Sequence, residues 1–198
     1  MSPSADGSGD HVSPQWAQWR AEVDLHEYEA RFTHDQAHGE ADCIADFGAA
    51  SVLDAGCGTG RVAIELHRRG IETVGVDFDH DLLALARTKQ PAMTWVQADL
   101  AALDLGRRFG LVAMPGNVML FCRTSDRESV VRSCAAHVRP GGWLVAGFAV
   151  REGATELGLD EYDRCAAAAG LRFEARWASW DRAPYGGGDY AVSVHRHR

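Results

Sequence analysis

The stretch "LDAGCGTGR", residues 53–61, decides the fold. Glycines stand at alternate positions, Gly56, Gly58 and Gly60, and the acid Asp54 precedes the first of them by two residues. An apolar run before the glycines and a helical pattern after them predict a strand, a glycine-rich turn and a helix. This is the first unit of an open α/β sheet, in which ligands bind outside the carboxyl ends of the strands. Glycines allow close approach of the backbone to such a ligand.

Strands and helices alternate along the chain from Ser51 onward. Five short runs rich in β-branched or aromatic residues are expected to be strands: 51–55, 71–76, 93–98, 109–114 and 143–150. Helical patterns lie between them: 61–69, 80–89 and 125–138. The sequence Arg-Pro-Gly-Gly, 139–142, is expected to end the third helix and turn the chain into the fifth strand. This alternation predicts a parallel sheet that is covered on both faces.

The C-terminal part breaks the alternation. A helix closed by a glycine is expected over 158–170, and strands over 171–179 and 189–196, with only "WDRAPYGGG" between the strands. Two adjacent strands without a helix between them form an antiparallel hairpin. The predicted fold class is therefore α/β, a doubly wound, seven-stranded, mostly parallel sheet with a reversed last strand, in three α/β/α layers.

The chain of 198 residues suits one domain with a substantial core. Residues 1–12 are small and polar, without the apolar core of a signal peptide, and are expected to be a disordered lead-in. A single domain is expected over 13–198, with an N-terminal helical cap at 13–50 and the ligand-binding core at 51–198. Helices expected at 15–32 and 39–47 have no strand to pair with, so they should pack across the carboxyl edge of the sheet or against its side.

Charge and cysteine usage limit the partners. The net charge is −8 and no basic face is evident, so nucleic acid is not an expected partner. No apolar run approaches the roughly 20 residues that a membrane span needs. The five cysteines are widely spaced and form no CxxC pair, which argues against a disulfide framework or a metal site and favours the reducing cytoplasm. The single lysine among many arginines indicates a GC-rich bacterial genome.

The glycine spacing argues against nucleotide phosphates. A dinucleotide motif, G-x-G-x-x-G, would need glycine where Arg61 stands, and the P-loop pattern is absent. Asp54 would repel a pyrophosphate and favour an ammonium or a sulfonium. A nicotinamide-dependent oxidoreductase on a similar sheet is the alternative that these two residues disfavour.

Two further acids end the next two strands. Asp77 ends "TVGVD", where an acid can accept hydrogen bonds from ribose hydroxyls, and Asp99 in "WVQADL" can accept from the amine of adenine. Leu100 offers a backbone donor to the base, and Phe78 and Leu82 offer apolar faces. S-adenosylmethionine fits these features because it has an amino-acid tail, a ribose and an adenine but no phosphate.

The sequence resembles a family at five motifs, which occur in the family's order: "VLDAGCGTG", "VGVDFD", "QADL", "FGLVAMPGNV" and "RPGGWLVAGF". The family is that of class I S-adenosylmethionine-dependent methyltransferases, and the chain is similar to its small bacterial members. The resemblance implies a Rossmann-like methyltransferase fold with a reversed seventh strand. It also implies that Gly56, Gly58 and Gly60 line the methionine tail, and that Met114 lies near the sulfonium by backbone contact. Asp77 would hold the ribose, and Asp99 with Leu100 the adenine.

The implied reaction is a direct displacement that transfers a methyl group to a small-molecule acceptor and leaves S-adenosylhomocysteine. Positioning dominates such a reaction, and a general base is needed only for a protonated acceptor, so no catalytic residue is assigned. The family's N-P-P-Y motif is replaced by "MPGNVMLF" at 114–121, which disfavours methylation of a nucleobase or a glutamine amide. Asn117 either polarises the acceptor or serves as a turn residue. A non-catalytic protein that binds S-adenosylmethionine, and a monomer or a homodimer, remain open.

The acceptor side is expected to involve two regions. One is the link after the sixth strand, with Trp180, Asp181, Arg182 and Tyr185. The other is the pair of N-terminal helices, which must close the pocket because the loop at 151–157 is short. These helices carry polar candidates for a base or a surface role: His26, Arg31, His34, His38 and Glu40. Trp16 and Trp19 are expected to anchor the first helix.

Overall fold

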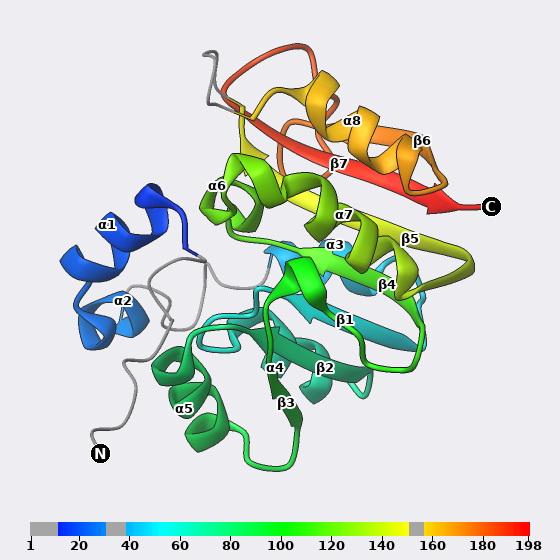
Figure 1. Ribbon diagram of the computed structural model, residues 1–198. Helices are drawn as coiled ribbons and strands as arrows, with labels where there is room; N and C mark the ends of the chain where they lie inside the picture. The colour runs from blue at the N-terminus through cyan, green and yellow to red at the C-terminus, as the bar shows by residue number, and fades with distance from the viewer. Residues whose placement is uncertain (1–11, 31–38, 151–156) are drawn as a thin grey trace, which may run out of the picture.

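In the computed structural model, which describes residues 12–30, 39–150 and 157–198, seven strands form one sheet (Figure 1). The strands are β1 (Ser51–Ala55), β2 (Glu72–Asp77), β3 (Thr94–Gln97), β4 (Phe109–Met114), β5 (Val138–Ala149), β6 (Leu171–Trp177) and β7 (Tyr190–His197). Their order is β3-β2-β1-β4-β5-β7-β6. The first five pair in parallel, and β7 runs antiparallel to both β5 and β6. The predicted seven-stranded sheet with a reversed last strand is confirmed.

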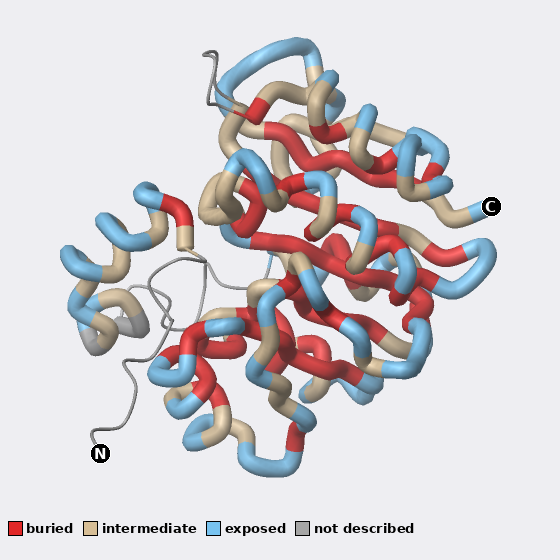
Figure 2. Tube along the Cα trace, in the orientation of Figure 1, coloured by how far each residue is buried: buried red, intermediate tan, exposed pale blue. Residues whose placement is uncertain are grey.

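Helices cover both faces of the sheet. They are α1 (Pro14–Glu22), α2 (Leu25–Ala30), α3 (Gly39–Ala45), α4 (Arg61–Arg68), α5 (His80–Lys89), α6 (Val118–Phe121), α7 (Arg127–Ala136) and α8 (Leu159–Ala168). Short 3-10 turns lie at Leu100–Ala102 and Thr124–Asp126. Successive residues of a strand point to opposite faces, so Leu53 packs in the core under α7 and α8 while Val52 packs under α3 and α4. Figure 2 shows the buried trace concentrated along the strands between these helices.

The first predicted helix is in fact two helices. Ser13 caps α1, because its Oγ accepts from Trp16 N at 3.0 Å, and Pro14 fits the first helical position. The chain then leaves the helix at Val23, which is extended. Asp24 Oδ1 accepts from the backbone N–H of Glu27 at 3.0 Å, so Asp24 starts α2 as a capping residue. The capping preference of this acid therefore breaks the predicted continuous helix. The part of that helix beyond residue 30 and the lead-in at 1–11 lie outside the described residues.

The third predicted helix ends before the Arg-Pro-Gly-Gly stretch at 139–142, as expected, but the fifth strand begins earlier than expected. Helix α7 ends at Ala136 and β5 starts at Val138, so the stretch lies inside the strand as an irregular segment. The pairing of β4 with β5 shifts register between Phe109 and Leu111, where the two backbones come close. Gly141 has φ +76°, and a Cβ on Gly142 would lie 2.6 Å from Gly110 O, so the glycines allow a bulge and a close backbone approach within the sheet.

The N-terminal helices take both of the positions expected for them. Helix α3 packs against the side of the sheet, with Ala41 and Ile44 fully buried beside α4. Helices α1 and α2 stand at the edge where the parallel strands end (Figure 1). None of the helices in the described part of the chain is long and apolar enough to cross a membrane.

Candidate active site

A cavity of about 780 Å³ opens at the carboxyl ends of the parallel strands. Its walls come from the loops after β1, β2, β3 and β4 and from α1, α2 and α6. Seven of the ten sequence-predicted cofactor residues line it: Gly56, Gly58, Asp77, Phe78, Leu82, Asp99 and Leu100. The other three, Asp54, Gly60 and Met114, do not appear in its lining. The structure therefore brings together residues from three different strand ends in one space.

The glycine loop adopts the backbone conformation for which glycine is suited. All three glycines have positive φ, +79° at Gly56, +55° at Gly58 and +82° at Gly60. The N–H groups of Gly56 and Cys57 both donate to Val76 O, at 2.8 and 2.9 Å, which ties the loop to the end of β2. A Cβ added at Gly58 would meet nothing within 4 Å. The loop is thus fixed to the sheet, with bare backbone at the cavity.

Gly60 has a packing role at the same loop. It precedes the first residue of α4, and a Cβ there would lie 2.4 Å from the Trp95 ring. Gly56 is also crowded, because its Cβ would lie 2.5 Å from Val118 Cγ2. The spacing of the glycines therefore serves two purposes, access to the cavity at Gly58 and close packing at Gly60. Contact of Gly60 with a methionine tail remains a prediction.

Asp77 joins the loops after β1 and β2. Its carboxylate accepts from Gly58 N at 2.7 Å and from Asp79 N at 2.9 Å. The side chain is buried, and this burial raises the pKa of Asp77, while the backbone donors act in the opposite direction. A carboxylate has about four lone-pair sites, so two backbone bonds leave acceptor capacity for ligand hydroxyls.

Asp54 is buried beneath α4 and is absent from the cavity lining. It is 1 % exposed, and its Oδ2 accepts from Ala63 N at 3.0 Å inside the first turn of α4. Desolvation raises its pKa to about 7, and the nearby charge of Arg61 opposes that shift. The residue thus supports the start of α4, and its predicted attraction for a sulfonium would have to act through space.

The part of the cavity next to Asp99, where adenine is predicted, combines local caps with apolar faces. Asp99 Oδ1 accepts from Ala101 N at 2.8 Å, so the residue caps the turn at Leu100–Ala102 as well as lining the cavity. Leu82 and Leu100 are buried beside it, whereas Phe78 is 38 % exposed. The cavity there is walled by apolar groups with one carboxylate at its margin.

Met114 is fully buried at the end of β4, with its sulfur 3.9 Å from Cys134 Sγ under α7. Only its backbone faces the strand end, so the predicted backbone contact remains a prediction. Cys57 is buried next to two carboxylates, and burial raises its pKa well above the ordinary value, which agrees with a structural thiol.

The N-terminal helices supply an aromatic wall, whereas the sequence indicated only anchors there. Trp16 packs on Phe78 with ring centroids 4.6 Å apart, so it covers the loop after β2. Trp19 lies 5.6 Å from Tyr28 and 5.7 Å from Phe121. All five rings line the cavity. Helix α1 buries none of its residues fully. A sequence pattern that detects buried helix faces therefore gives no signal for this wall.

An ion pair between α3 and α4 also lines the cavity. Arg61 Nη1 and Nη2 donate to Glu40 Oε2 and Oε1 at 2.8 and 2.6 Å, which is the bidentate geometry of a strong pair. The two side chains are about one-fifth exposed. From sequence, Arg61 was only a departure from the dinucleotide motif, and the pairing depends on how two helices flank β1.

The far end of the cavity rests on β5 and β7. Asn117 has φ +67°, and its Oδ1 accepts from Ala149 N at 2.8 Å, so it serves as a turn residue that ties the loop after β4 to β5. Its predicted action on an acceptor remains a prediction. Trp180 Nε1 donates to Tyr190 Oη at 2.9 Å, and Tyr190 lines the cavity. Burial raises the pKa of Tyr190, so the phenol keeps its proton.

None of the four residues predicted for the acceptor side in the link after β6 lines the cavity: Trp180, Asp181, Arg182 and Tyr185. Arg182 donates to Cys43 O at 2.9 Å, and Tyr185 Oη donates to Gly188 O at 3.1 Å. Arg182 also lies over the Phe47 ring, 5.2 Å from its centroid. The link therefore packs on the end of α3, where it supports Trp180 and holds no ligand group in the cavity.

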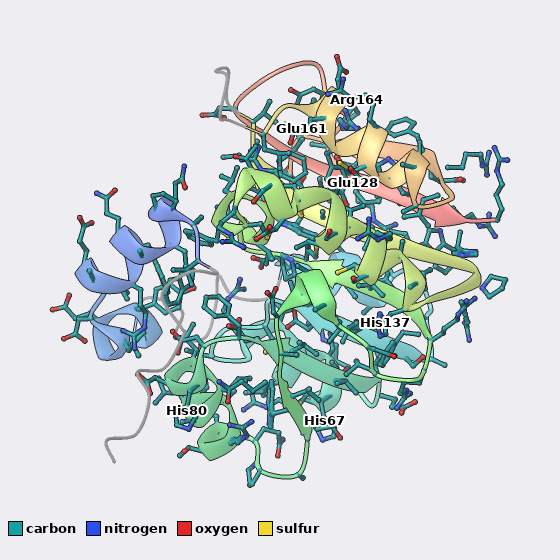
Figure 3. The ribbon with its side chains drawn as sticks, viewed as in Figure 1. His67, His80, Glu128, His137, Glu161 and Arg164 are labelled. Atoms are coloured by element: carbon teal, nitrogen blue, oxygen red, sulfur yellow. The ribbon has the colours of Figure 1, made fainter. Side chains whose placement is uncertain are left out.

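No histidine appears among the described residues that line the cavity. The labelled His67, His80 and His137 lie on or next to α4, α5 and α7, outside that lining (Figure 3). His34 and His38, together with Arg31 and the loop at 151–156, lie outside the described residues. Within the described part, no group of three or more His, Cys, Asp or Glu side chains could hold a metal ion.

Comparisons with known proteins agree with this geometry. A family model described as "Methyltransferase domain" matches residues 52–142. The chain is 35% identical over 98 residues to dTDP-3-amino-3,4,6-trideoxy-alpha-D-glucopyranose N,N-dimethyltransferase of Streptomyces venezuelae. The matched region covers 49% of this chain and 41% of that protein. It is 37% identical over 94 residues to malonyl-[acyl-carrier protein] O-methyltransferase of Pseudescherichia vulneris, with 47% and 36% covered. The chain thus spans about two-fifths of the length of these curated relatives.

Among solved structures, a TehB-like SAM-dependent methyltransferase from Corynebacterium glutamicum superposes with a TM-score of 0.79 at 28% identity. The superposition covers 94% of this chain and 100% of that one. The amino pentose methyltransferase CalS10 from Micromonospora echinaspora has a TM-score of 0.71 at 22% identity over 89% of this chain and 98% of its own, which shows a shared fold. A methyltransferase domain thus matches residues 52–142, and the likeness over the full chain together with the strand order shows the fold of the class I S-adenosylmethionine-dependent methyltransferases.

Proposed function

We propose that the protein transfers a methyl group from S-adenosylmethionine to a small-molecule acceptor and releases S-adenosylhomocysteine. One observation carries this proposal: a single cavity joins the bare glycine loop after β1, Asp77 after β2 and Asp99 after β3. These strands are neighbours in the order β3-β2-β1, so the three features lie side by side. An adenosyl amino acid has a tail, a ribose and a base in the same succession.

The residues fit this ligand. Gly58 has open space in front of its backbone, which suits the amino-acid tail. Asp77 has spare acceptor capacity for the ribose hydroxyls, and Asp99 lies at the margin of an apolar slot formed by Leu82 and Leu100. No lysine lines the cavity in the described part of the chain, and both lining arginines already bind carboxylates, so a pyrophosphate would find little to hold it.

When bound, S-adenosylmethionine supplies a methyl group on a sulfonium, which an acceptor takes by direct displacement. The protein's part is to orient the reactants and exclude water, and such positioning can contribute about 7–11 kcal/mol to a two-reactant step. The sheet fixes the cofactor end, while Trp16 and Trp19 cover the cavity from α1. No catalytic residue is assigned to the displacement.

We extend the proposal to the setting of the protein. The acceptor is a small molecule, since the curated relatives are named for amino-sugar and malonyl-carrier substrates. Residues 13–198 act as one methyltransferase domain, because the 13–50 part contributes Trp16, Trp19 and Glu40 to the cavity. The five cysteines are all free, which suits a reducing cytoplasm, and the net charge of −8 disfavours nucleic acid. We propose a monomer or a homodimer.

Calorimetry with S-adenosylhomocysteine tests the proposal. We expect a dissociation constant near the micromolar range, about −8 kcal/mol. Asp77→Asn should weaken binding by about tenfold or more, since it removes the charged acceptor for the ribose hydroxyls. Asp160→Asn, an exposed change on α8, is the matched control and should bind like the unmodified protein. Absence of heat with the unmodified protein, or full affinity in Asp77→Asn, would contradict the cofactor assignment.

A further inference from the structure

The cavity extends beyond the residues that the cofactor needs. Past the glycine loop, its lining continues onto α1, α2, α6 and the start of β7. We call this part the acceptor end, formed by Trp19, Tyr28, Phe121 and Tyr190. None of these four residues belongs to the motifs at the ends of β1, β2 and β3, so they are available for the second reactant.

Three aromatic rings form one side of the acceptor end. Trp19 stands between the other two, edge-on to Tyr28 at an interplanar angle of 82° and tilted by 43° to Phe121. The Tyr28 and Phe121 rings come from different helices, and Trp19 on α1 connects them. Aromatic faces carry a negative quadrupole and attract cations, by about 0.5–2 kcal/mol for a contact of this kind. This wall thus suits an apolar body, and it favours positive charge over negative charge.

The charged groups of the described lining also favour a cationic ligand. Among the described residues, the lining holds four carboxylates, Glu40, Asp77, Asp99 and Asp126, against the guanidinium groups of Arg61 and Arg123. Both guanidinium groups already bind a lining carboxylate, Arg61 to Glu40 and Arg123 Nε to Asp126 Oδ2 at 2.6 Å. The remaining carboxylates leave the lining with an excess of two negative charges.

The excess negative charge of this lining would therefore repel an anionic acceptor. Such an acceptor would lose water in a partly closed cavity without gaining an uncommitted cation among the described lining residues, which is costly. A cationic acceptor gains from the rings at the acceptor end and, through space, from Asp77 and Asp99 at the cofactor end. The phenol of Tyr190, held by Trp180, adds a polar group at the end of the aromatic wall.

We infer that the acceptor end takes a small amine, protonated at neutral pH, on an apolar or aromatic body, in preference to a carboxylate or a phosphate ester. The inference rests on the proposed function, because it assigns the second reactant of the same cavity. It concerns recognition of the acceptor, and the ammonium group is the element recognised.

Three probes of matched shape test it: 2-phenylethylamine as the cation, 3-phenylpropionate as the anion and 2-phenylethanol as the neutral compound. Each is titrated into the protein with and without saturating S-adenosylhomocysteine, and binding is measured by calorimetry. We expect the amine to bind about tenfold or more tightly than the carboxylate, with the alcohol between them, and the preference to shrink in high salt.

Variants of Phe121 test whether the amine binds at the acceptor end. Phe121→Ala should weaken binding of 2-phenylethylamine by about fivefold or more. Phe121→Leu, which keeps apolar volume but has no ring, separates the π contact from packing and should lose a smaller part. Affinity for S-adenosylhomocysteine should change less than affinity for the amine in both variants, since Phe121 lies outside the cofactor motifs and acts on that end only through its contact with Trp19 on α1. Phe173→Ala, at an exposed ring on β6 outside the cavity lining, is the control and should bind the amine normally.

The outcomes separate the two proposals. Equal or tighter binding of the carboxylate, no binding of any probe, or full amine affinity in Phe121→Ala would overturn the amine assignment even if S-adenosylhomocysteine binds. Amine preference that depends on Phe121 supports the assignment, and a simultaneous absence of S-adenosylhomocysteine binding would count against the methyltransferase proposal alone.

Discussion

The two ends of the cavity are built in different ways. The cofactor end, which is formed by the loops after β1, β2 and β3, stands mainly on β1 and β2, whose residues are almost all buried, while the edge strand β3 is half-buried or exposed. The loop after β1 is tied to the sheet by backbone hydrogen bonds. The acceptor end stands on α1, which buries no residue fully and is exposed or half-buried along its length (Figure 2). Side-chain contacts of Trp16, Trp19 and Arg20 hold α1 in place.

This difference suits the two ligands. A cofactor that is the same in related enzymes is best bound by a rigid backbone, and a packed sheet provides one. An acceptor that differs between related enzymes is better met by peripheral elements, whose side chains can change without cost to the core. The stability of the protein should therefore reside in the cofactor end, and the acceptor end should respond to changes without unfolding of the sheet.

The largest effect is expected from Gly60→Ala. The new methyl group would meet the Trp95 ring at 2.4 Å and would force a left-handed φ of +82° on alanine. We expect a loss of about 2–4 kcal/mol of unfolding free energy, because strain and overpacking add. Urea denaturation measures it.

Gly70→Ala is the matched control. Gly70 has φ +80° but nothing within 4 Å of its Cβ position, so only the backbone strain, about 1 kcal/mol, should be lost. Equal losses in the two variants would show that packing of Gly60 on Trp95 does not stabilise the cofactor end.

A pH-dependent effect of intermediate size is expected from Asp54. Its pKa is about 7 in the folded protein, against an ordinary value of 3.8, because burial disfavours the charged form. The folded state therefore binds a proton that the unfolded state has released between these two values, and the stability that Asp54 contributes at low pH is lost as pH rises from about 4 through 7.

Asp54→Asn should remove this dependence, since the amide can still accept from Ala63 N. We expect the variant to be more stable than the original protein at pH 8, by about 1–3 kcal/mol, with a smaller difference at pH 5. Urea unfolding at both values measures this change, with Asp160→Asn on α8 as the control. A constant difference at the two pH values would contradict the raised pKa.

The smallest effect is expected at the acceptor end, from Arg20→Ala. Arg20 joins α1 to the start of α5 through Asp79 at 3.0 Å and Asp81 at 2.9 Å. Partly exposed pairs contribute about 0–1 kcal/mol, so the sheet should keep its stability while α1 releases more often. We expect dissociation of S-adenosylhomocysteine to speed up by about two- to fivefold at low salt, and less at high salt.

Stopped-flow tryptophan fluorescence follows this release, because Trp16 packs beside Phe78 at the cavity. Arg132→Ala, which removes an exposed pair with Glu128 on α7, is the control. A large loss of unfolding free energy in Arg20→Ala would break the contrast between a stable cofactor end and a peripheral acceptor end.

Most of the sheet could be predicted because periodicity and glycine placement act locally. Errors arose where two local signals competed. Asp24 looked like one polar residue in a long helix, but its capping bond starts a new helix. Pro140 and its two following glycines were expected to precede the fifth strand, but β5 begins at Val138 and includes them as a bulge opposite Phe109 and Leu111.

The site shows the same limit. Asp54 and Asp77 were both expected at the cavity because both lie near strand ends. The register pairs Asp54 with Gly75, so the two carboxylates lie on the same face of the sheet. Asp77 ends β2 and lines the cavity, whereas Asp54 lies one residue inside β1 and accepts from Ala63 N of α4. Trp16 and Trp19 were recognised as anchors, and their place in the lining depends on the docking of α1.

The sequence by itself determined the sheet, its reversed strand and the strand-end residues that line one end of the cavity, because those features follow from contiguous motifs whose backbone conformation is set within a few residues. The tertiary structure alone decided the acceptor end. Glu40 meets Arg61, and Trp19 meets Phe121, across elements that are far apart in the chain. Such contacts depend on how separate helices dock on the finished sheet, and no local pattern encodes that arrangement.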